Sequence, residues 1–307
     1  MRKIAVLIPI HNGLEFTRHS LKILIEGINK SLWKLNIDLY IIVIDDGSTD
    51  GSSLWIRQNY PDVVICKGNG NLWWSGAINM GAKFALNSLD CSFVLLWNND
   101  VIPDQNYFSN LFSLLKSNEN AQLFGSKILI KDSDKVWFMG GIFKASTGRK
   151  KMIGLQQPDS DQYNKITECD WLTGMGTIVH KSVIEKIGYW DEKNFPQYHG
   201  DSDFSYRAKK AGFPVCVYPE LIIWNDITNT GSAHEFTWKS LIASLSSIRS
   251  DFNFKKDLLF YRKHSSGIIA YFYLFYKYFR FIGGFIKNKY FSFYSFQKKQ
   301  SKNTGCE

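Results

Sequence analysis

The sequence predicts an α/β fold with a Rossmann-like, mostly parallel central sheet flanked by helices. Three observations predict it. Short apolar runs rich in β-forming residues recur along the first half of the chain, stretches with apolar residues at helical spacing separate them, and polar or glycine-rich turns end the runs. A strand–helix–strand order implies parallel strands joined by right-handed crossovers. Ligands in such open sheets bind at the carboxyl ends of the strands.

The first half of the chain supplies the expected parallel strands and their crossover helices. Each expected strand is apolar on both faces, which is typical of a strand covered by helices on either side. The expected strands are residues 3–10, 38–44, 63–66 and 93–97. The expected helices are residues 14–28, 52–60 and 77–86, and residues 68–76 form a glycine-rich loop before the last of them.

The second half is expected to add further strands and short helices. Alternating apolar residues predict strands at 122–130 and 136–143, and a turn leads into another strand within 170–179. Residues 144–166 are polar and are expected to form a flexible loop. Short helices are expected at 181–187 and 201–211, and a glycine follows each of them.

The net charge of +9 is concentrated at one end of the chain. Residues 254–307 hold eleven Lys and Arg against two Asp and Glu, whereas residues 1–253 hold 26 of each sign. The basic character therefore indicates an anionic partner for the C-terminal segment and carries no information about an active site. Five cysteines without close pairs or metal-ligand spacing favour reduced thiols in a cytosolic compartment, and no secretion signal is expected.

Two acidic turns follow buried strands and are expected to meet at one edge of the sheet. Asp45 and Asp46 follow the second expected strand, and Asn98, Asn99 and Asp100 follow the strand at 93–97. Asp100 is a candidate ligand for a hard cation that faces a diphosphate, because Mg²⁺ takes one or two carboxylates together with phosphate oxygens. Asp46 is a candidate partner of a base or a ribose. The alternative is that the two acidic segments are simply polar turns after core strands, without a ligand.

A second pair of carboxylates, Asp201 and Asp203, lies at the start of an expected helix. Two residues at i and i+2 diverge by about 200° on a helix, so they cannot serve the same purpose. Carboxylates are favoured at helix N-termini, so capping is an alternative explanation for either residue. Thr173 and Gly174 lie in a turn where a ligand could approach the backbone closely, although a glycine at a turn also has a purely conformational explanation.

Five segments, in order along the chain, resemble those of a known family. They are residues 8–12, 43–51, 71–79, 98–100 and 190–207. Together they resemble the family-2 glycosyltransferases of the GT-A fold. The Trp-Trp-Ser-Gly-Ala sequence at 73–77 is most similar to bacterial rhamnosyltransferase-type members. The resemblance covers roughly residues 3–230.

The resemblance implies a divalent metal, Mg²⁺ or Mn²⁺, at Asp100 and a catalytic base at Asp201. The positions implied to support catalysis or to contact the acceptor are Asp203, Arg207, Trp171, Thr173 and Gly174. The positions implied to bind the nucleotide-sugar are Pro9, His11, Asn12, Asp45, Asp46, Ser48, Asn71, Trp74, Gly76, Asn79, Asn98 and Asn99.

The sequence departs from the family pattern at two places. Gly200 stands where the family has a Glu before its Asp-x-Asp, which removes one carboxylate that would help to orient the acceptor. The family's His metal ligand after the following strand is missing, and Asn225 or Asp226 is the candidate replacement unless the third ligand is absent. The second departure bears on metal dependence and not on nucleotide binding.

The resemblance implies an inverting glycosyltransferase. Its catalytic domain is expected at residues 1–253, with a nucleotide-sugar half at about 1–120 and an acceptor half at about 121–253. The expected reaction moves rhamnose or another hexose from a nucleoside diphosphate-sugar to a hydroxyl of a glycan or lipid-linked glycan, in bacterial surface polysaccharide synthesis. The alternative is a non-catalytic nucleotide-sugar-binding protein that retains the crevice, because function is decided by the site and not by the fold.

Residues 254–307 are expected to form a basic, aromatic helical extension. Fourteen of the 29 residues from 268 to 296 are Phe or Tyr, and four cations interrupt them. A spanning helix needs about 20 predominantly apolar residues, so a helix lying on the membrane is expected, with the protein peripheral on the cytoplasmic face of the cell membrane. The alternatives are packing against the catalytic domain or in a homodimer. No nucleic acid is expected as a partner, because no matching module is visible.

Overall fold

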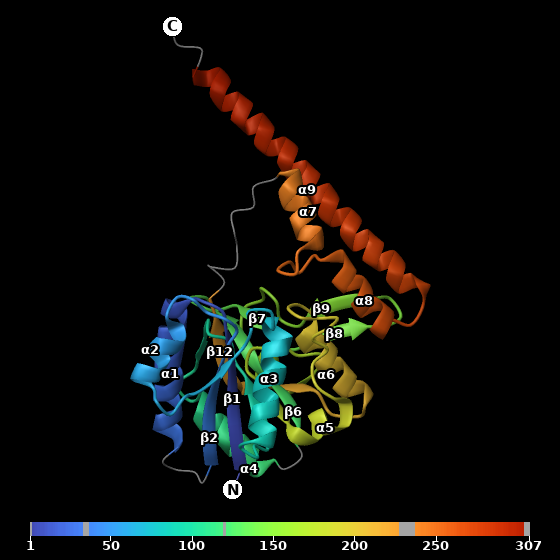
Figure 1. Cartoon of the computed structure of the whole chain (residues 1–307). Helices are drawn as coiled ribbons and strands as arrows, with labels where there is room; N and C mark the ends of the chain where they lie inside the picture. Colours follow the sequence, from blue (N-terminus) through green and yellow to red (C-terminus); the bar gives the residue numbers. More distant parts are fainter. Residues whose placement is uncertain (1, 33–36, 119–120, 227–236, 304–307) are drawn as a thin grey trace. The chain divides into compact units, whose positions relative to one another are not determined.

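The computed structural model describes the chain except residues 1, 33–36, 119–120, 227–236 and 304–307 (Figure 1). The chain forms two compact units. The first, called the main unit, comprises Met1–Phe143 and Lys150–Thr228, and the second, called the tail unit, comprises Lys144–Arg149 and Asn229–Glu307. The expected domain boundary at residue 253 rests on charge and resemblance, whereas the two units are separated by their backbone packing. The assignment of domains therefore stays a prediction.

A mixed sheet forms the centre of the main unit. In the described residues its strands run in the order β10-β12-β6-β11-β4-β1-β2-β3, with β5 paired to β12 and β7 paired to β6. The bounds are β1 (Arg2–Ile10), β2 (Ile37–Asp45), β3 (Val64–Lys67), β4 (Phe93–Leu96), β5 (Val101–Pro103), β6 (Leu123–Ile130), β7 (Val136–Phe138), β10 (Thr167–Glu168), β11 (Thr177–His180) and β12 (Cys216–Asn225).

The parallel part of the sheet is the part built from the first half of the chain. β3, β2, β1 and β4 all run parallel, whereas β11 is antiparallel to both β4 and β6. β1, β2 and β4 carry the most completely buried apolar residues, including Ile4–Leu7 and Val94–Leu96 at 0–1% exposure. The description as mostly parallel therefore holds for β3 to β4, and the later strands make the whole sheet mixed.

Helices flank the sheet as the alternating pattern predicted. The bounds are α1 (Leu14–Leu32), α2 (Ser52–Asn59), α3 (Trp73–Asn87), α4 (Tyr107–Ser117), α5 (Lys181–Ile187) and α6 (Gly200–Lys210). α3 packs against β1 and β2 (Figure 1), and the contacts between elements show that α1 packs against β5 and α4. Gly81 permits the close approach of α3, because a Cβ there would lie 2.7 Å from Ile44 Cδ1.

Two expectations about loops were wrong. The glycine-rich loop expected at 68–76 ends earlier, because α3 already begins at Trp73. Residues 144–166, expected as a flexible loop, contain β9 (Arg149–Met152), which pairs with β8 (Gly141–Lys144), and a 3₁₀ turn at Asp161–Tyr163. β9 has the sequence Arg-Lys-Lys-Met and is only half buried, so it lacks the apolar alternation by which strands are recognised.

The tail unit contains three helices in its described residues: α7 (Trp238–Ser246), α8 (Phe254–His264) and α9 (Ile268–Asn303). α7 begins with a capping box between Thr237 and Ser240, and its presence was not predicted. α8 and α9 pack on each other through Asp257, whose Oδ2 accepts hydrogen bonds from Lys277 Nζ and Tyr278 OH, both at 2.6 Å. No helix in the described part of the chain is both long and apolar enough to span a membrane.

Candidate functional site

The turn after β1 and the loop after β2 are bonded to each other at the carboxyl edge of the sheet. The register pairs Ile10 with Asp45, so the two strands end side by side. Beyond them His11 Nδ1 lies 2.6 Å from the carbonyl oxygen of Asp46, and the Asn12 N–H donates to Ser48 Oγ at 2.8 Å. The predicted nucleotide-binding residues of these two segments are therefore brought together, with Pro9 in the last part of β1.

Asp45 is fully buried and holds the base of this loop together. Its carboxylate accepts hydrogen bonds from the Ser48 N–H and from the Ser53 hydroxyl, and it pairs with Lys67 Nζ at 2.7 Å. Burial by itself raises the pKa of Asp45, but the bonds from Lys67, Ser48 and Ser53 outweigh it and leave the pKa below its ordinary value. Asp45 is thus ionised at neutral pH, and its hydrogen bonds fix the conformation of the loop after β2.

Asp46 organises the loop that leads into α3. Its Oδ1 accepts the Gly70 N–H at 2.7 Å, and its Oδ2 accepts the N–H groups of Leu72 and Trp73 at 2.8 and 3.1 Å. A carboxylate that receives several backbone N–H groups fixes the path of the backbone. Asp46 therefore positions the loop beside the predicted nucleotide site, and Asn71, which is exposed, lies in the loop so held.

The first turns of α3 connect this loop to the segment that precedes α6. The Ser75 N–H donates to the Pro196 carbonyl at 2.8 Å. Asn79 Nδ2 donates to the Trp190 carbonyl at 2.9 Å and to Glu192 Oε2 at 2.7 Å. Both N–H bonds of the Asn79 amide are thereby engaged, so its observed role is to attach α3 to residues 190–192, and direct contact with a nucleotide stays a prediction.

Asp201 lies in the first turn of α6, where a helix favours a carboxylate. Its Oδ2 accepts the N–H of Gly174 at 3.1 Å, and its Oδ1 accepts the N–H of Ser202 at 2.7 Å. The predicted base and the predicted acceptor turn at Thr173 and Gly174 are therefore adjacent. The Asp201 side chain is oriented by two backbone donors and remains partly accessible.

Gly174 is required at this turn because Trp74 lies on it. A Cβ at Gly174 would be 2.2 Å from Cζ2 of the Trp74 indole. Trp74 comes from the nucleotide half of the site, and Gly174 binds Asp201, so the two predicted halves meet here. Gly76 follows on α3, and a Cβ there would lie 3.3 Å from Leu72 and 3.5 Å from Glu192 Oε2.

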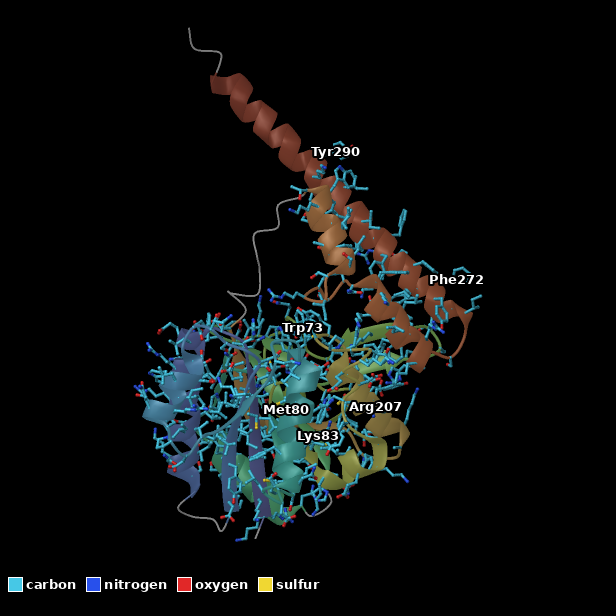
Figure 2. The ribbon with its side chains drawn as sticks, viewed as in Figure 1. Trp73, Met80, Lys83, Arg207, Phe272 and Tyr290 are labelled. Atoms are coloured by element: carbon cyan, nitrogen blue, oxygen red, sulfur yellow. The ribbon has the colours of Figure 1, made fainter. Side chains whose placement is uncertain are left out.

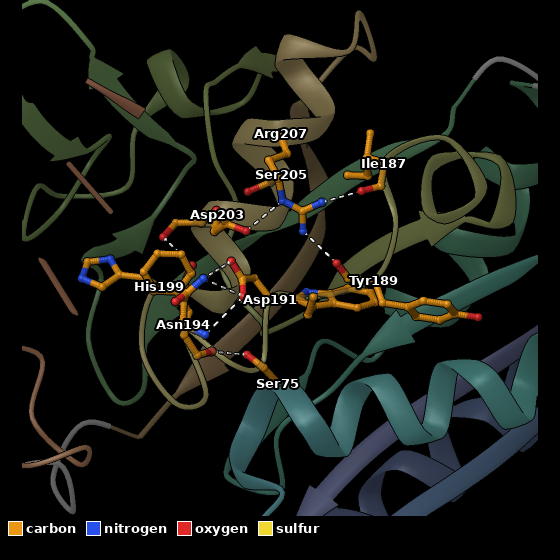
Figure 3. Close-up of polar contacts among 12 residues, drawn as sticks. Ser75, Ile187, Tyr189, Asp191, Asn194, His199, Asp203, Ser205 and Arg207 are labelled. Carbon is orange, nitrogen blue, oxygen red and sulfur yellow. Dashed lines mark hydrogen bonds and ion pairs between the residues drawn. The ribbon is translucent and has the colours of Figure 1, made fainter. Parts of the chain in front are cut away.

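Asp203 points away from Asp201, as expected for residues at i and i+2. It is fully buried and pairs with Arg207 Nε at 2.8 Å, while the other two guanidinium nitrogens donate to the carbonyls of Ile187 and Tyr189 at 2.7 and 2.8 Å (Figure 3). The pair anchors α6 to the segment after α5. Asp203 and Arg207 therefore support Asp201 through the backbone.

Trp171 is buried beside the site and packs against neighbouring side chains and the backbone. Its side chain is 6% exposed, its ring lies 5.2 Å from that of Phe138, and Lys150 Nζ lies 4.2 Å above it. A Cβ at Gly141 would collide with the indole, so the ring rests directly on the backbone of β8. Little of Trp171 is left to contact an acceptor.

The departure at Gly200 has a local physical reason. A Cβ at Gly200 would lie 2.1 Å from Ser75 Oγ and 3.1 Å from the Phe195 carbonyl oxygen. Ser75 Oγ in turn donates to that same carbonyl at 2.5 Å (Figure 3). Ser75 therefore occupies the space in which the side chain of a Glu would begin.

Asp100 and Asp226 lie side by side at the edge of the sheet. β5 pairs antiparallel with β12 and sets Val101 opposite Asn225, so Asp100, which precedes β5, and Asp226, which follows β12, are neighbours across the pairing. Although Asp100 is exposed by its accessible surface, crowding of its carboxyl by neighbouring protein atoms raises the pKa of Asp100, and the negative charge of Asp226 raises it further. Asp226 is also paired with Lys131 Nζ at 3.1 Å. The negative charge of Asp226 disfavours that of Asp100, and a hard divalent cation bound between them would relieve this repulsion.

The two asparagines before Asp100 are placed differently from it. Asn99 Nδ2 donates to Thr17 Oγ1 of α1 at 3.2 Å and thus faces the turn after β1. Asn98 is partly buried. No group of three or more His, Cys, Asp or Glu able to hold a metal occurs among the described residues. Within this part of the chain Asp100 and Asp226 are the neighbouring carboxylates, and phosphate oxygens and water would share the coordination of a cation held there.

Three of the six non-glycine residues with positive φ in the described part of the chain adjoin the site, whereas Asp90, Asp132 and Gln156 lie elsewhere. Among the described residues, the non-glycine positions with positive φ include Asn12 at 61°, Trp73 at 56° and His199 at 68°. Each adjoins a predicted binding or catalytic segment, and a bulky residue such as Trp is rarely found in this region. Such strain persists where the surroundings hold it, and it is enriched at functional sites.

Sequence reasoning missed several residues that hold the site. Ser75, Gln197 and Lys67 were not singled out, although Gln197 Oε1 accepts the Trp74 N–H at 3.3 Å. Their contacts join segments that are distant in sequence, so no local pattern marks them. The one local signal is Asp45 itself, because a carboxylate buried after a strand needs a positively charged side chain such as that of Lys67 as its partner.

Residues 5–183 match the family described as Glycosyl transferase family 2. The chain is 25% identical over 178 residues to the low-salt glycan biosynthesis hexosyltransferase Agl10 of Haloferax volcanii, covering 57% of this chain and 54% of that protein. It is 23% identical over 186 residues to the dTDP-rhamnosyl transferase RfbF of Shigella flexneri, covering 59% and 58%. The chain thus spans only a little over half the length of these relatives.

Two solved structures share the fold of this chain. Superposition on GalNAc-T7 with UDP, GalNAc and Mn²⁺ gives a TM-score of 0.58 at 12% identity, covering 82% of this chain and 50% of that one. The mannosyltransferase PcManGT from Pyrobaculum calidifontis, in complex with GDP-Man and Mn²⁺, gives 0.52 at 14% identity, covering 75% and 59%. The predicted α/β fold of GT-A type is confirmed.

Proposed function

The chain belongs to glycosyl transferase family 2, and from that premise we propose that it is an inverting glycosyltransferase. It moves rhamnose or another hexose from a nucleoside diphosphate-sugar to a hydroxyl of a glycan or lipid-linked glycan. The observation that carries this proposal is the placement of Asp201, which two backbone N–H groups orient beside the turn at Gly174. A general base needs this kind of fixed orientation within hydrogen-bond reach of the proton that it removes.

The proposed reaction is a single displacement. The acceptor hydroxyl oxygen bonds to the anomeric carbon as the bond from that carbon to the diphosphate breaks, and the hydroxyl proton passes to Asp201. The nucleoside diphosphate leaves with the bonding electron pair. Attack from the face opposite the leaving group inverts the configuration at the anomeric carbon.

In this proposal the nucleotide-sugar lies over the loops that Asp45 and Asp46 hold, at the edge where β1, β2 and β4 end. Asp100 and Asp226 are the residues that would hold the divalent cation, Mg²⁺ or Mn²⁺. A bound cation offsets the negative charge that develops on the leaving diphosphate. Trp74 and Gly174 lie between this region and Asp201. The proposed setting is bacterial surface polysaccharide synthesis in the cytoplasm.

The experiment that tests the function is a screen of the full chain against a panel of sugar nucleotides, with Mn²⁺ and a set of glycan and lipid-linked acceptors. Release of nucleoside diphosphate together with a glycosylated product of inverted configuration is expected for one donor class. Tight donor binding without any product across the panel would instead support the second candidate, a non-catalytic nucleotide-sugar-binding protein. The departure at Gly200 is the observation that favours that candidate.

The metal proposal gives its own prediction. Asp100→Ala and Asp226→Ala should each weaken Mn²⁺-dependent binding of a nucleoside diphosphate by about tenfold or more, because each removes one of the charges that hold the cation. Binding in the presence of a chelator should be much less affected. Isothermal titration calorimetry with and without Mn²⁺ measures both. Glu15→Ala, at an exposed carboxylate on α1, is the matched control and should bind like the parent.

The pH dependence of the same titration has a defined sign. The cation binds the ionised carboxylates, and the pKa of Asp100 lies above its ordinary value of 3.8. Affinity should therefore begin to fall on acidification at a higher pH than it would for an unperturbed Asp. Equal affinity for the nucleotide with Mn²⁺ and with chelator in the unmutated chain would remove Asp100 from the metal site.

A further inference from the structure

The last long helix, α9, has two apolar faces, and only one of them packs within the tail unit. Ala270, Leu274 and Tyr278 are spaced by four and are 0–5% exposed. The Tyr278 hydroxyl also donates a hydrogen bond to Asp257 Oδ2 of α8 at 2.6 Å, and Phe281 stacks on Phe252 with ring centroids 4.1 Å apart. This packing face satisfies the need of the tail unit for a core.

The other apolar face is exposed to solvent. We call it the aromatic face of α9. Its members are Ile268 at 70% exposure, Ile269 at 61%, Phe272 at 67%, Phe275 at 57%, Tyr276 at 52%, Phe279 at 77% and Tyr290 at 59%. Intervals of three and four align Ile268, Phe272, Phe275 and Phe279 along one side of a helix. Figure 2 shows Phe272 and Tyr290 projecting from α9. A continuous exposed apolar stripe of this kind marks an interaction site.

Cations border the aromatic face. Arg280 and Lys287 are both exposed, and on a regular helix they lie roughly 60–80° around the axis from Phe272. The only two acidic residues of the segment 254–307 are Asp257, which is buried on the packing side, and Glu307. The rim of the stripe within α9 is therefore basic, in a segment that carries eleven cations.

We propose that the aromatic face of α9 binds an anionic lipid surface, with the helix lying in the plane of the interface. The rings enter the boundary between headgroups and acyl chains, and Arg280 and Lys287 contact the anionic headgroups. No described helix can span a membrane, which agrees with a helix that lies on the surface. Ile268, Tyr271, Phe272 and Phe275 line a shallow apolar depression that suits the insertion of an acyl chain.

The charge distribution favours a lipid surface over a second copy of the chain. Two copies joined by their aromatic faces would bring two strongly basic segments together, and the repulsion would oppose the contact. An anionic surface turns the same charges into attraction. This inference is independent of the proposed catalytic activity, because it uses only residues of the tail unit.

The test is co-sedimentation of the full chain with vesicles of phosphatidylcholine containing roughly one third phosphatidylglycerol, at low salt and at about 0.5 M NaCl. We expect binding that salt weakens and does not abolish, because burial of the rings is insensitive to salt. Arg280→Gln with Lys287→Gln should weaken partitioning about 30-fold at low salt, which corresponds to about 1 kcal/mol for each cation.

A variant with Phe272→Ser, Phe275→Ser and Phe279→Ser should lose binding by about 100-fold at either salt concentration. The matched control carries Leu54→Ser, Leu155→Ser and Ile166→Ser, which remove three exposed apolar side chains of the main unit, and it should bind like the parent. Circular dichroism of each variant confirms that the chain is folded. Equal sedimentation of the Phe variant and the parent would overturn the proposal.

Two other outcomes would also overturn it. One is the absence of sedimentation with these vesicles at low salt. The other is a homodimer, seen by sedimentation velocity, that does not bind vesicles and that the Phe variant converts to a monomer. The second result would assign the aromatic face to a second copy of the chain.

Discussion

Asp201→Asn should reduce the rate of sugar transfer by about 10²–10⁴-fold, the usual cost of losing a general base. The substitution keeps the size of the side chain and one oxygen that can accept the Gly174 N–H at 3.1 Å, while the hydrogen bond from the Ser202 N–H is lost. The amide cannot take up the proton of the acceptor hydroxyl. Binding of the nucleotide-sugar should be unchanged, because Asp201 has no part in the loops that hold it.

Initial rates at saturating donor, together with donor titration calorimetry, separate these effects. A fall in kcat with an unchanged donor affinity is the expected pattern, and the melting temperature should stay close to that of the parent. Near-full transfer by Asp201→Asn would show that another group removes the proton, and the assignment within the pair of aspartates would then be wrong.

Asp203→Asn should instead lower the free energy of unfolding by about 3 kcal/mol or more. It leaves the partly buried Arg207 guanidinium with two carbonyl partners and without the carboxylate that pairs with it. Breaking one side of a buried pair is costly because the remaining charge is still removed from water. Any loss of activity should follow the loss of the folded state and should recover when the assay temperature is lowered.

Urea unfolding followed by circular dichroism measures this effect. The matched control is Glu15→Gln, which breaks an exposed pair with Arg18 at 2.9 Å and should change the free energy of unfolding by less than about 0.5 kcal/mol. A variant Asp203→Asn that is as stable as the parent yet inactive would make Asp203, and not the residue two positions before it, the group that acts on the acceptor.

The fold and the gathering of candidate residues were largely predictable from the sequence. Buried strands such as β1 and β4 are apolar on both faces, and the polar turns after them must lie at one edge because the strands are parallel. The same reasoning placed Asp46 and Asp100 at that edge. It could not show that the carboxylate oxygens of Asp46 accept hydrogen bonds from backbone N–H groups within residues 70–73. That loop is more than twenty residues away along the chain and meets Asp46 only in the folded structure.

The unpredicted parts share one physical origin. β9 and α7 are held by pairing, capping and packing and not by a strong apolar period, so their sequences carry little signal. The bonds by which the Asn79 amide joins α3 to residues 190–192 were likewise not expected, and its predicted contact with a nucleotide stays a prediction. Whether a polar side chain faces a ligand or another loop depends on contacts between distant segments, which a single sequence does not display.

The crowding of Gly200 by Ser75 makes these two positions epistatic. A single change of Gly200 to the Glu of the family pattern meets the Ser75 hydroxyl at the first side-chain atom, so it would test packing rather than the missing carboxylate. Replacing Ser75 by Ala removes the hydroxyl but also removes its bond to the Phe195 carbonyl. Each single change is therefore expected to lower the stability. Ser75→Ala together with Gly200→Glu removes the 2.1 Å contact with the hydroxyl and leaves the Phe195 carbonyl oxygen 3.1 Å from the new Cβ. Directed evolution that accepts one substitution at a time would therefore rarely combine the two changes. A library that varies Ser75 and Gly200 together is needed to test the missing carboxylate.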